Sequence, residues 1–332
     1  MNRDSSYGGF FGLEGTFGQP FMPDTLYLNS ARNCLTALFR TNPVETVHIP
    51  YFCCGVVRDS IEKAGAKVCF YHVDEKLEIS PDAEIPQHAV ILYVNYFGIK
   101  SAYATRLAQH FPRMVLDNSQ ALYSKARGTF ATVYSPRKFM GVPDAGLLDT
   151  ALPVNISDVR EDCVPLLAHL VRRIDLSPEE TYLSFLNAEC LMSKLTPKRI
   201  SGFSERLLDT INHQEIIDRR SANANLASLL LGQFNALSVP SEFAEPPLCY
   251  PLYIPSCGNS LRKKLINKRI FIATYWPEVR DECAANSCEH SFVDHLLPIP
   301  IDQRYSLDDV NKCCNSIIDL IRVEPSLEFN NI

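Results

Sequence analysis

The sequence lacks the patterns that would point to a membrane, a nucleic acid or a metal. No apolar run approaches the roughly 20 residues that cross a bilayer. Lys and Arg number 32 against 38 Asp and Glu, so the net charge of −6 offers no basic excess for nucleic acid or an anionic membrane surface. The eight histidines show neither HxH nor HExxH spacing. We therefore expect no nucleic-acid, membrane or metal partner.

The twelve cysteines lack the spacing of a disulfide framework or a zinc knuckle. No CxxC occurs, and two pairs are adjacent, Cys53–Cys54 and Cys313–Cys314. Adjacent cysteines make poor intramolecular bridges and poor tetrahedral metal sites. The first residues, MNRDSSYGGFFGLEG, show no charged region followed by an apolar core, as a signal peptide would. These features predict free thiols in a reducing cytoplasm.

The first half of the chain alternates short apolar runs with helical stretches. Near-continuous runs of β-branched and aromatic residues, separated by helices, are typical of buried parallel strands in a layered α/β domain. The runs lie at residues 46–49, 67–71, 89–94 and 113–117. Ligands of such sheets bind at the carboxyl ends of the strands, so the polar residues that end these runs are candidates for a site.

The second half is mostly helical up to residue 232 and then returns to an α/β pattern. A break is expected near Pro197, and a long amphipathic helix is predicted over residues 204–231, ending at Gly232. After a turn-rich stretch, the pattern predicts a strand at 249–254, a helix at 260–267, a strand at 270–274 and a helix at 307–323. We therefore predict two domains in the 332 residues, 1–238 and 239–332.

The segment from 115 to 141 carries the most informative polar residues. One strand ends in Asp117, and the next delivers Ser135 and Lys138 into a loop. This pattern is compatible with pyridoxal phosphate, which needs a lysine amine for its aldehyde and a buried carboxylate to keep its pyridine nitrogen protonated. From spacing alone two simpler interpretations stay open, because Asp117 could cap a turn and Lys138 could be a solvated loop lysine.

A second candidate site precedes the predicted helix at residues 34–39. Ser30 as N-cap, followed by residues with free backbone N–H groups, would form a phosphate cradle at the positive end of that helix. Most serine N-caps only cap their helices, however, and an arginine such as Arg32 is more often a surface residue.

The order of these motifs resembles that of the DegT/StrS family of pyridoxal-phosphate-dependent sugar aminotransferases. The matching segments span about residues 7 to 322: NSARNCL at 29–35, IPYFC at 49–53, VNYFG at 94–98, DNSQA at 117–121, SPRK at 135–138, and later the stretches 216–230, 250–253 and 297–300. The resemblance implies an α/β, aspartate-aminotransferase-like fold (fold type I). Such a chain has a three-layer large domain with a mainly parallel sheet and a small α+β C-terminal domain.

The resemblance also assigns roles in cofactor binding and catalysis. Lys138 matches the lysine that binds the cofactor aldehyde, and Asp117 matches the partner of the pyridine nitrogen. Gln120 corresponds to a residue that lies against the cofactor. Ser30 and Ala31 match the positions that hold the phosphate, by hydroxyl and backbone amide.

Further positions follow from the same resemblance, together with two departures from it. Ser135 fits a phosphate-binding serine, Asn95 lines up with a strand end facing the cofactor pocket, and Phe52 is our choice for the ring that stacks on the cofactor. Arg32 stands where the family has a third phosphate donor, so its cation is expected to bind phosphate instead. Pro197 replaces an asparagine that often reaches the partner subunit's cofactor.

The function implied by the resemblance is ping-pong transamination. Glutamate would be the amino donor, and a keto-sugar or nucleotide-linked keto-sugar the acceptor, although the short chain could favour a smaller acceptor. A homodimer with shared active sites is expected, and the segment at 7–14 either reaches the neighbouring site or is an ordered tail. Two alternatives stay open: another pyridoxal phosphate reaction on the same fold, or a catalytically decayed member with a binding or regulatory role.

Overall fold

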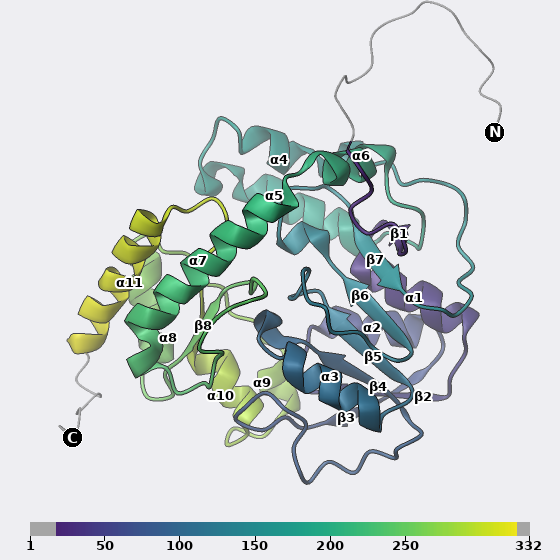
Figure 1. Ribbon diagram of the computed structural model, residues 1–332, viewed down its shortest axis with the longest axis horizontal. Helices are drawn as coiled ribbons and strands as arrows, with labels where there is room; N and C mark the ends of the chain where they lie inside the picture. Colours follow the sequence, from purple (N-terminus) through teal and green to yellow (C-terminus); the bar gives the residue numbers. More distant parts are fainter. Residues whose placement is uncertain (1–17, 324–332) are drawn as a thin grey trace, which may run out of the picture.

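A computed structural model describes residues 18–323 and shows a layered molecule with a central sheet (Figure 1). The expected N-terminal segment at 7–14 lies outside the described residues. The sheet has seven strands, six running in one direction and β7 in the other. In spatial order they are β1 (Leu26–Leu28), β7 (Gly146–Asp149), β6 (Ala131–Tyr134), β5 (Met114–Asn118), β4 (Val90–Val94), β2 (Thr46–Pro50) and β3 (Lys67–Tyr71).

The parallel part of the sheet confirms the α/β prediction. Every residue of β4 and β5 is buried, as the continuous apolar runs of these strands require when helices cover both faces. The helices α1 (Ala31–Thr41) and α2 (Gly55–Lys63) pack together on one face, and α3 (Ser101–His110) lies on the other (Figure 1). The result is the expected three-layer arrangement.

Ser30 begins α1 as the sequence predicts. Its backbone is extended, and its side chain accepts a hydrogen bond from the amide of Asn33, which satisfies one of the free N–H groups of the first turn. The helix therefore starts at Ala31, three residues before the predicted start. This places the N-terminus of α1 next to the sheet.

The predicted long helix at 204–231 is wrong, because the chain forms two helices there. These are α6 (Gly202–Thr210) and α7 (His213–Leu231). Asn212 causes the break: its side chain accepts from the amide of Glu215 and caps α7, which an interior helical residue cannot do. Before them lie η3 (Val164–Leu166), α4 (Ala168–Arg172) and α5 (Pro178–Ser193). The chain is non-helical at Pro197, as predicted.

The C-terminal part contains a two-stranded antiparallel sheet, with helices packed around it. Its elements are β8 (Tyr250–Tyr253), α8 (Gly258–Asn267), α9 (Val279–Glu282), α10 (Cys288–His295), β9 (Leu296–Ile299) and α11 (Leu307–Arg322). Three short 3₁₀ turns complete the described elements: η1 (Tyr96–Gly98), η2 (Pro136–Lys138) and η4 (Gly232–Phe234).

The predicted strand at 270–274 does not form. The segment runs without regular structure between Arg269 and Trp276, which both have positive φ, and β8 and β9 pair with each other instead. The core of this part also includes apolar residues of α7, which packs along α11 (Figure 1).

The boundary between the two domains at residue 238 stays a prediction. Within 18–323, no helix is both long enough and apolar enough to cross a membrane.

Candidate active site

A cavity of about 390 Å³ opens where β5 and β6 end and α1 begins. It lies at the carboxyl end of these parallel strands, the edge where ligands of such sheets bind. Six of the predicted site residues line it, although they come from three separate stretches of the sequence: Ser30, Ala31, Arg32, Asp117, Ser135 and Lys138. The structure thus brings together the carboxylate, the lysine and the N-terminus of α1.

Asp117 is held in a fixed orientation at the end of β5. It is 7% exposed, and its Oδ1 accepts hydrogen bonds from the backbone amide (2.8 Å) and the hydroxyl of Ser119. These bonds occupy one carboxylate oxygen and leave Oδ2 for another partner. Ser119 also lines the cavity, and we missed it as a site residue. The Asp-x-Ser spacing, which favours a side-chain-to-backbone turn, was the signal that could have found it.

Lys138 ends the short turn η2, directly after β6. Its side chain is exposed to the cavity, and among the described residues no hydrogen bond or ion pair engages its Nζ. Ser135, three residues earlier, is buried and lines the same cavity. The amine is therefore free to react or to bind a ligand.

The N-terminus of α1 supplies hydrogen-bond donors to the other side of the cavity. Strand β7 passes so close to it that a Cβ at Gly146 would lie 2.1 Å from the carbonyl carbon of Ser30, so this position needs glycine. Arg32 is the second residue of the helix, and burial lowers the pKa of its guanidinium while Glu189 opposes that shift. The backbone amides and this cation together form an anion-binding arrangement.

Further charged and polar side chains line the cavity and were missed by the sequence analysis. Arg137 donates to Glu189 of α5 at 2.6 Å. Burial lowers the pKa of His169, on α4. Burial raises the pKa of the Cys54 thiol, and the nearby Lys138 charge acts in the opposite direction. No sequence spacing marked Glu189 or His169, because only tertiary packing brings α4 and α5 to the sheet edge.

Phe52 does not lie where we expected it. Its ring is 1% exposed and is enclosed by Tyr96, Trp276 and Phe292, with ring centroids 4.7–5.6 Å away, and it does not line the cavity. Clustering with other aromatic rings buries more apolar surface than facing a polar cavity would. From the IPYFC segment and the residue after it, Cys54 is the one that lines the cavity.

Asn95 and Gln120 lie beside the cavity without lining it. Asn95 follows β4, and its Nδ2 donates to Asn118 at 3.0 Å, which ties neighbouring strand ends together. The Oε1 of Gln120 accepts from the amide of Phe97 at 2.8 Å, while its Nε2 is buried without a hydrogen-bond partner. In this structure both side chains shape the strand ends, and direct cofactor contact by either stays a prediction.

The C-terminal part contacts the loop that carries Lys138. The carbonyl oxygen of Phe139 accepts from Gln303 at 2.7 Å and from Arg220 at 3.4 Å, and the Arg220 guanidinium lies 4.7 Å from the centre of the Phe139 ring. Arg220 is 2% exposed, and burial lowers its pKa. These contacts fix the position of the loop from the side opposite the sheet.

A second cavity, of about 750 Å³, lies next to the first. Lys138 and Arg137 line both cavities, and Arg173 and Arg304 contribute to the second one only. Among the described residues, Arg304 forms its ion pair with Asp302 at 2.7 Å. A ligand in the second cavity would therefore lie next to the Lys138 side chain on a surface with several arginines.

The structure is similar to solved sugar aminotransferases. A DegT DnrJ EryC1 StrS aminotransferase from Brucella abortus is 12% identical, with a TM-score of 0.59 over 89% of this chain and 85% of that chain. The aminotransferase TlmJ from Streptoalloteichus hindustanus is 14% identical, with a TM-score of 0.63 over 91% of this chain and 87% of that chain. The sugar aminotransferase CalS13 from Micromonospora echinospora is 13% identical, with a TM-score of 0.60 over 90% of this chain and 87% of that chain. No protein-family model matches the sequence, and no curated protein matches it significantly.

These comparisons establish the fold. The chain has the α/β fold of the DegT/DnrJ/EryC1/StrS aminotransferases, with the mostly parallel sheet that the motif order predicts. The shared architecture covers about nine-tenths of the chain in each case. At such low identity the likeness concerns the fold, and the chemistry has to be argued from the cavity.

Proposed function

We propose that the protein is a pyridoxal-phosphate-dependent aminotransferase. One observation carries the proposal: a buried carboxylate, Asp117, and a free lysine amine, Lys138, line one cavity together with the donor-rich N-terminus of α1. Each of these groups alone has a simpler explanation, such as a turn cap, a solvated lysine or a helix cap. Their convergence in one cavity is what pyridoxal phosphate chemistry requires.

The donor set of the cavity fits this cofactor. Its volume of about 390 Å³ falls within the roughly 300–1,000 Å³ of small-molecule sites. Ser30, Ala31, Arg32 and Ser135 would hold the phosphate, and Asp117, whose Oδ1 is already bound by Ser119, would offer Oδ2 to the pyridine N–H. When bound, the cofactor supplies an electron sink for the electrons of a carbon–hydrogen bond.

Each of these residues would then have a separate role in the reaction. Lys138 would bind the cofactor aldehyde and, once freed by the amino donor, accept a proton from the donor's α-carbon at Nζ. Asp117 would keep a positive charge on the pyridine nitrogen. The contacts of Gln303 and Arg220 to the Phe139 carbonyl would keep the Lys138 loop in place during both half-reactions.

The second cavity supports a keto-sugar acceptor, with glutamate as the amino donor. Lys138 and Arg137 line both cavities, so an acceptor bound in the second cavity would lie beside the lysine that binds the cofactor. Arg173, which forms no ion pair among the described residues, would offer charge to an anionic group, such as the phosphates of a nucleotide-linked keto-sugar, whereas Arg304 is paired with Asp302 in the same cavity. A smaller keto-sugar would use only part of this space.

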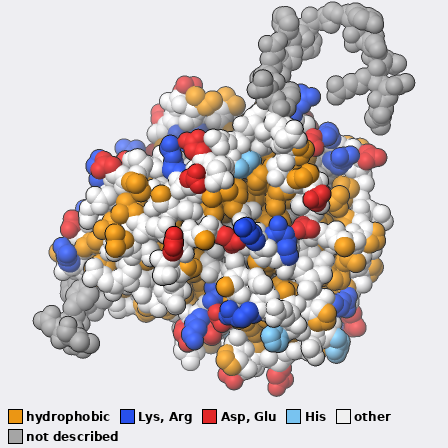
Figure 2. Space-filling view, in the orientation of Figure 1, with side chains coloured by type: hydrophobic (Ala, Val, Ile, Leu, Met, Phe, Trp, Pro, Cys, Tyr) orange, Lys and Arg blue, Asp and Glu red, His pale blue; other side chains and the backbone are white. Residues whose placement is uncertain are grey.

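A homodimer is part of the proposal, since one face of the chain exposes apolar side chains next to the first cavity. Ten large hydrophobic residues on and around α4 and α5 are exposed: Val159, Val164, Val171, Ile174, Leu176, Tyr182, Leu183, Phe185, Leu186 and Leu191. Figure 2 shows hydrophobic side chains across the middle of the molecular surface. An apolar face of this extent favours burial against another protein surface, and a second copy would complete the cavity wall. The twelve free cysteines suit a reducing cytoplasm.

The test follows the absorbance of the protein after it is loaded with pyridoxal phosphate. The native chain should show the visible absorbance of the lysine-bound cofactor, and glutamate should convert it to that of the amino form. Lys138→Ala should lose this absorbance and all transamination, whereas Lys125→Ala, at an exposed loop position, should behave like the native chain.

Two outcomes would contradict the proposal. Full activity of Lys138→Ala would show that Lys138 takes no part in the reaction. Cofactor binding without any response to glutamate or other amino acids would favour another pyridoxal phosphate reaction or a binding role.

A further inference from the structure

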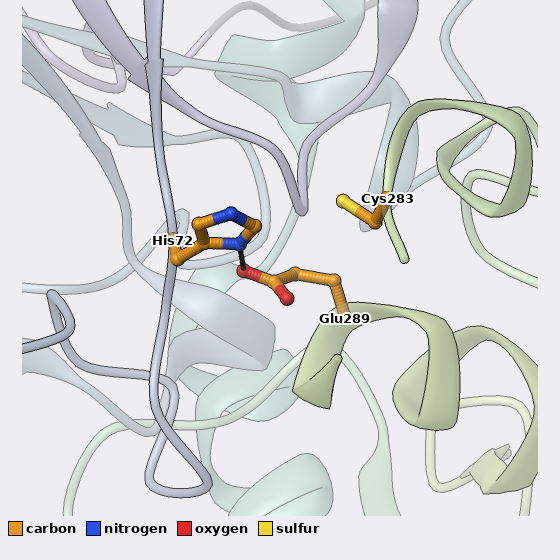
Figure 3. Close-up of side chains that lie close together, drawn as sticks. All are labelled: His72, Cys283 and Glu289. Atoms are coloured by element: carbon orange, nitrogen blue, oxygen red, sulfur yellow. Dashed lines mark hydrogen bonds and ion pairs between the residues drawn. The ribbon is translucent and has the colours of Figure 1, made fainter. Parts of the chain in front are cut away.

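A histidine, a cysteine and a glutamate meet at a second place in the molecule, away from the cavities. His72 follows β3, Cys283 follows α9, and Glu289 lies in the first turn of α10. One potential ligand atom from each lies within 4.8 Å of the other two, and the Nδ1 of His72 is 2.9 Å from Oε1 of Glu289. Figure 3 shows the sulfur of Cys283 directed toward the imidazole and the carboxylate.

The charge balance of this cluster favours a cation. Glu289 is 1% exposed, and its one ion-pair partner within the described residues is His72. The neighbouring Glu282 is already paired with Arg58. A buried carboxylate without a lysine or arginine partner is costly unless a histidine charge or a metal ion compensates it.

The thiol of Cys283 would supply the third ligand atom. Its sulfur lies within 4.8 Å of a potential ligand atom of His72 and of Glu289. A coordinating thiol loses its proton to the charge of a bound metal.

We propose that His72, Cys283 and Glu289 form a binding site for Zn²⁺, with water in the fourth position. Sulfur, imidazole nitrogen and carboxylate oxygen are the usual ligands of Zn²⁺, and three protein ligands leave one tetrahedral position open. With metal–ligand bonds of about 2.0–2.3 Å, the ligand atoms would lie roughly 3.3–3.6 Å apart. The three atoms now lie within 4.8 Å of one another, with 2.9 Å between Nδ1 of His72 and Oε1 of Glu289, and the exposed side chain of His72 has room to adjust.

The position of the site would let a metal ion link two parts of the chain. Oε1 of Glu289 also accepts from the backbone amide of Val73 at 2.8 Å, so the cluster already joins α10 to the segment after β3. A metal bound there would hold α9 and α10 of the C-terminal part against the edge strand of the sheet. No local motif reveals the site, since 217 residues separate His72 from Glu289.

Metal titration of the full chain, reduced and freed of metal, tests the proposal. Co²⁺ serves as the probe for Zn²⁺ because a thiolate bound to Co²⁺ absorbs in the near ultraviolet. We expect one Co²⁺ per chain to give this absorbance, Zn²⁺ to displace it, and the midpoint of thermal unfolding to rise with added Zn²⁺. Absence of a thiolate band in the native chain would overturn the site.

Matched variants identify the ligands among the twelve cysteines. Cys283→Ser should abolish the band, and His72→Gln and Glu289→Gln should weaken binding at least about tenfold. Cys288→Ser, five residues further on, should keep both band and affinity. A band that survives in Cys283→Ser or disappears in Cys288→Ser would assign the metal to other thiols and refute the proposal. The exposed position of His72 makes its variant informative even if Glu289→Gln fails to fold.

Discussion

The two walls of the first cavity are built differently. The wall made by the sheet and α1 consists of buried groups held by hydrogen bonds within the chain, such as Asp117 with Ser119 and Ser30 with Asn33. The wall made by α4 and α5 also contributes polar side chains, those of Glu189 and His169. Next to it, however, lie exposed apolar side chains such as Leu183, which is 74% exposed.

This difference separates two requirements of the site. The sheet wall is complete in a single chain, because strand ends and a helix N-terminus fix its polar groups without outside help. The helical wall leaves large apolar side chains exposed, on the face that would meet a second copy in the proposed dimer. We infer that chemistry depends mainly on the first wall, and assembly on the second.

The largest expected effect comes from the sheet wall. Asp117→Asn keeps an oxygen for the Ser119 hydrogen bonds but removes the negative charge, so the protein should fold and retain the cofactor. Transamination should slow by at least about 10²-fold, the scale expected when an electrostatic partner of the reacting group is lost. Single-turnover kinetics with glutamate measure the effect.

Asp149→Asn is the control for this change, since Asp149 lies on β7 of the same sheet and does not line the first cavity. It should retain the native rate. An Asp117→Asn variant with native turnover would show that the carboxylate has no electronic role.

The helical wall is tested by Leu183→Lys on α5. If the exposed apolar face joins two copies, a buried lysine charge there should weaken the dimer by about 2 kcal/mol or more, the scale of an interface hot spot. Sedimentation velocity over a range of concentrations measures the shift toward monomer. Leu229→Lys changes a leucine of α7 that is 78% exposed, and it should leave the assembly unchanged. Equal behaviour of the two variants would place the interface elsewhere.

The sheet wall was largely predictable from the sequence. Continuous apolar runs encode buried parallel strands, and polar residues that follow them must meet at one edge, so Asp117 and Lys138 could be brought together without a structure. Ser30 could be predicted as a cap because capping is local chemistry.

The helical wall could not be predicted in the same way. Glu189 and His169 reach the cavity only because α4 and α5 pack against it, and no periodicity in the sequence specifies that packing. The position of Phe52 could not be predicted for the same reason, since its aromatic neighbours Trp276 and Phe292 lie more than 200 residues away in the sequence. The strand expected at 270–274 failed because strand formation depends on a pairing partner, which the sequence of the strand itself does not contain.

The smallest expected effect concerns pH and the packing behind the sheet wall. His213, at the start of α7, accepts from the Tyr123 hydroxyl at Nδ1, donates to the Leu208 carbonyl at Nε2, and stacks on Phe21. Burial lowers its pKa, so the unfolded chain takes up a proton first as the pH falls below about 6.5. The free energy of unfolding should therefore decrease from pH 6.5 downward, until the folded histidine also becomes protonated, whereas near pH 8 the titration of His213 should add no pH dependence.

His213→Gln should lower stability at pH 8, because it removes the ring that stacks on Phe21, yet give a shallower loss of stability between pH 6.5 and 5. Urea unfolding at pH 8, 6.5 and 5 measures both effects, with His110→Gln on the exposed side of α3 as the control. His169, on the helical wall, also has a pKa lowered by burial, so His169→Gln shows which wall carries more of the pH dependence. The pH dependence of the free energy of unfolding could stay the same in His213→Gln and become weaker in His169→Gln. In that case the acid sensitivity arises in the helical wall, and the packing around His213 does not contribute to it.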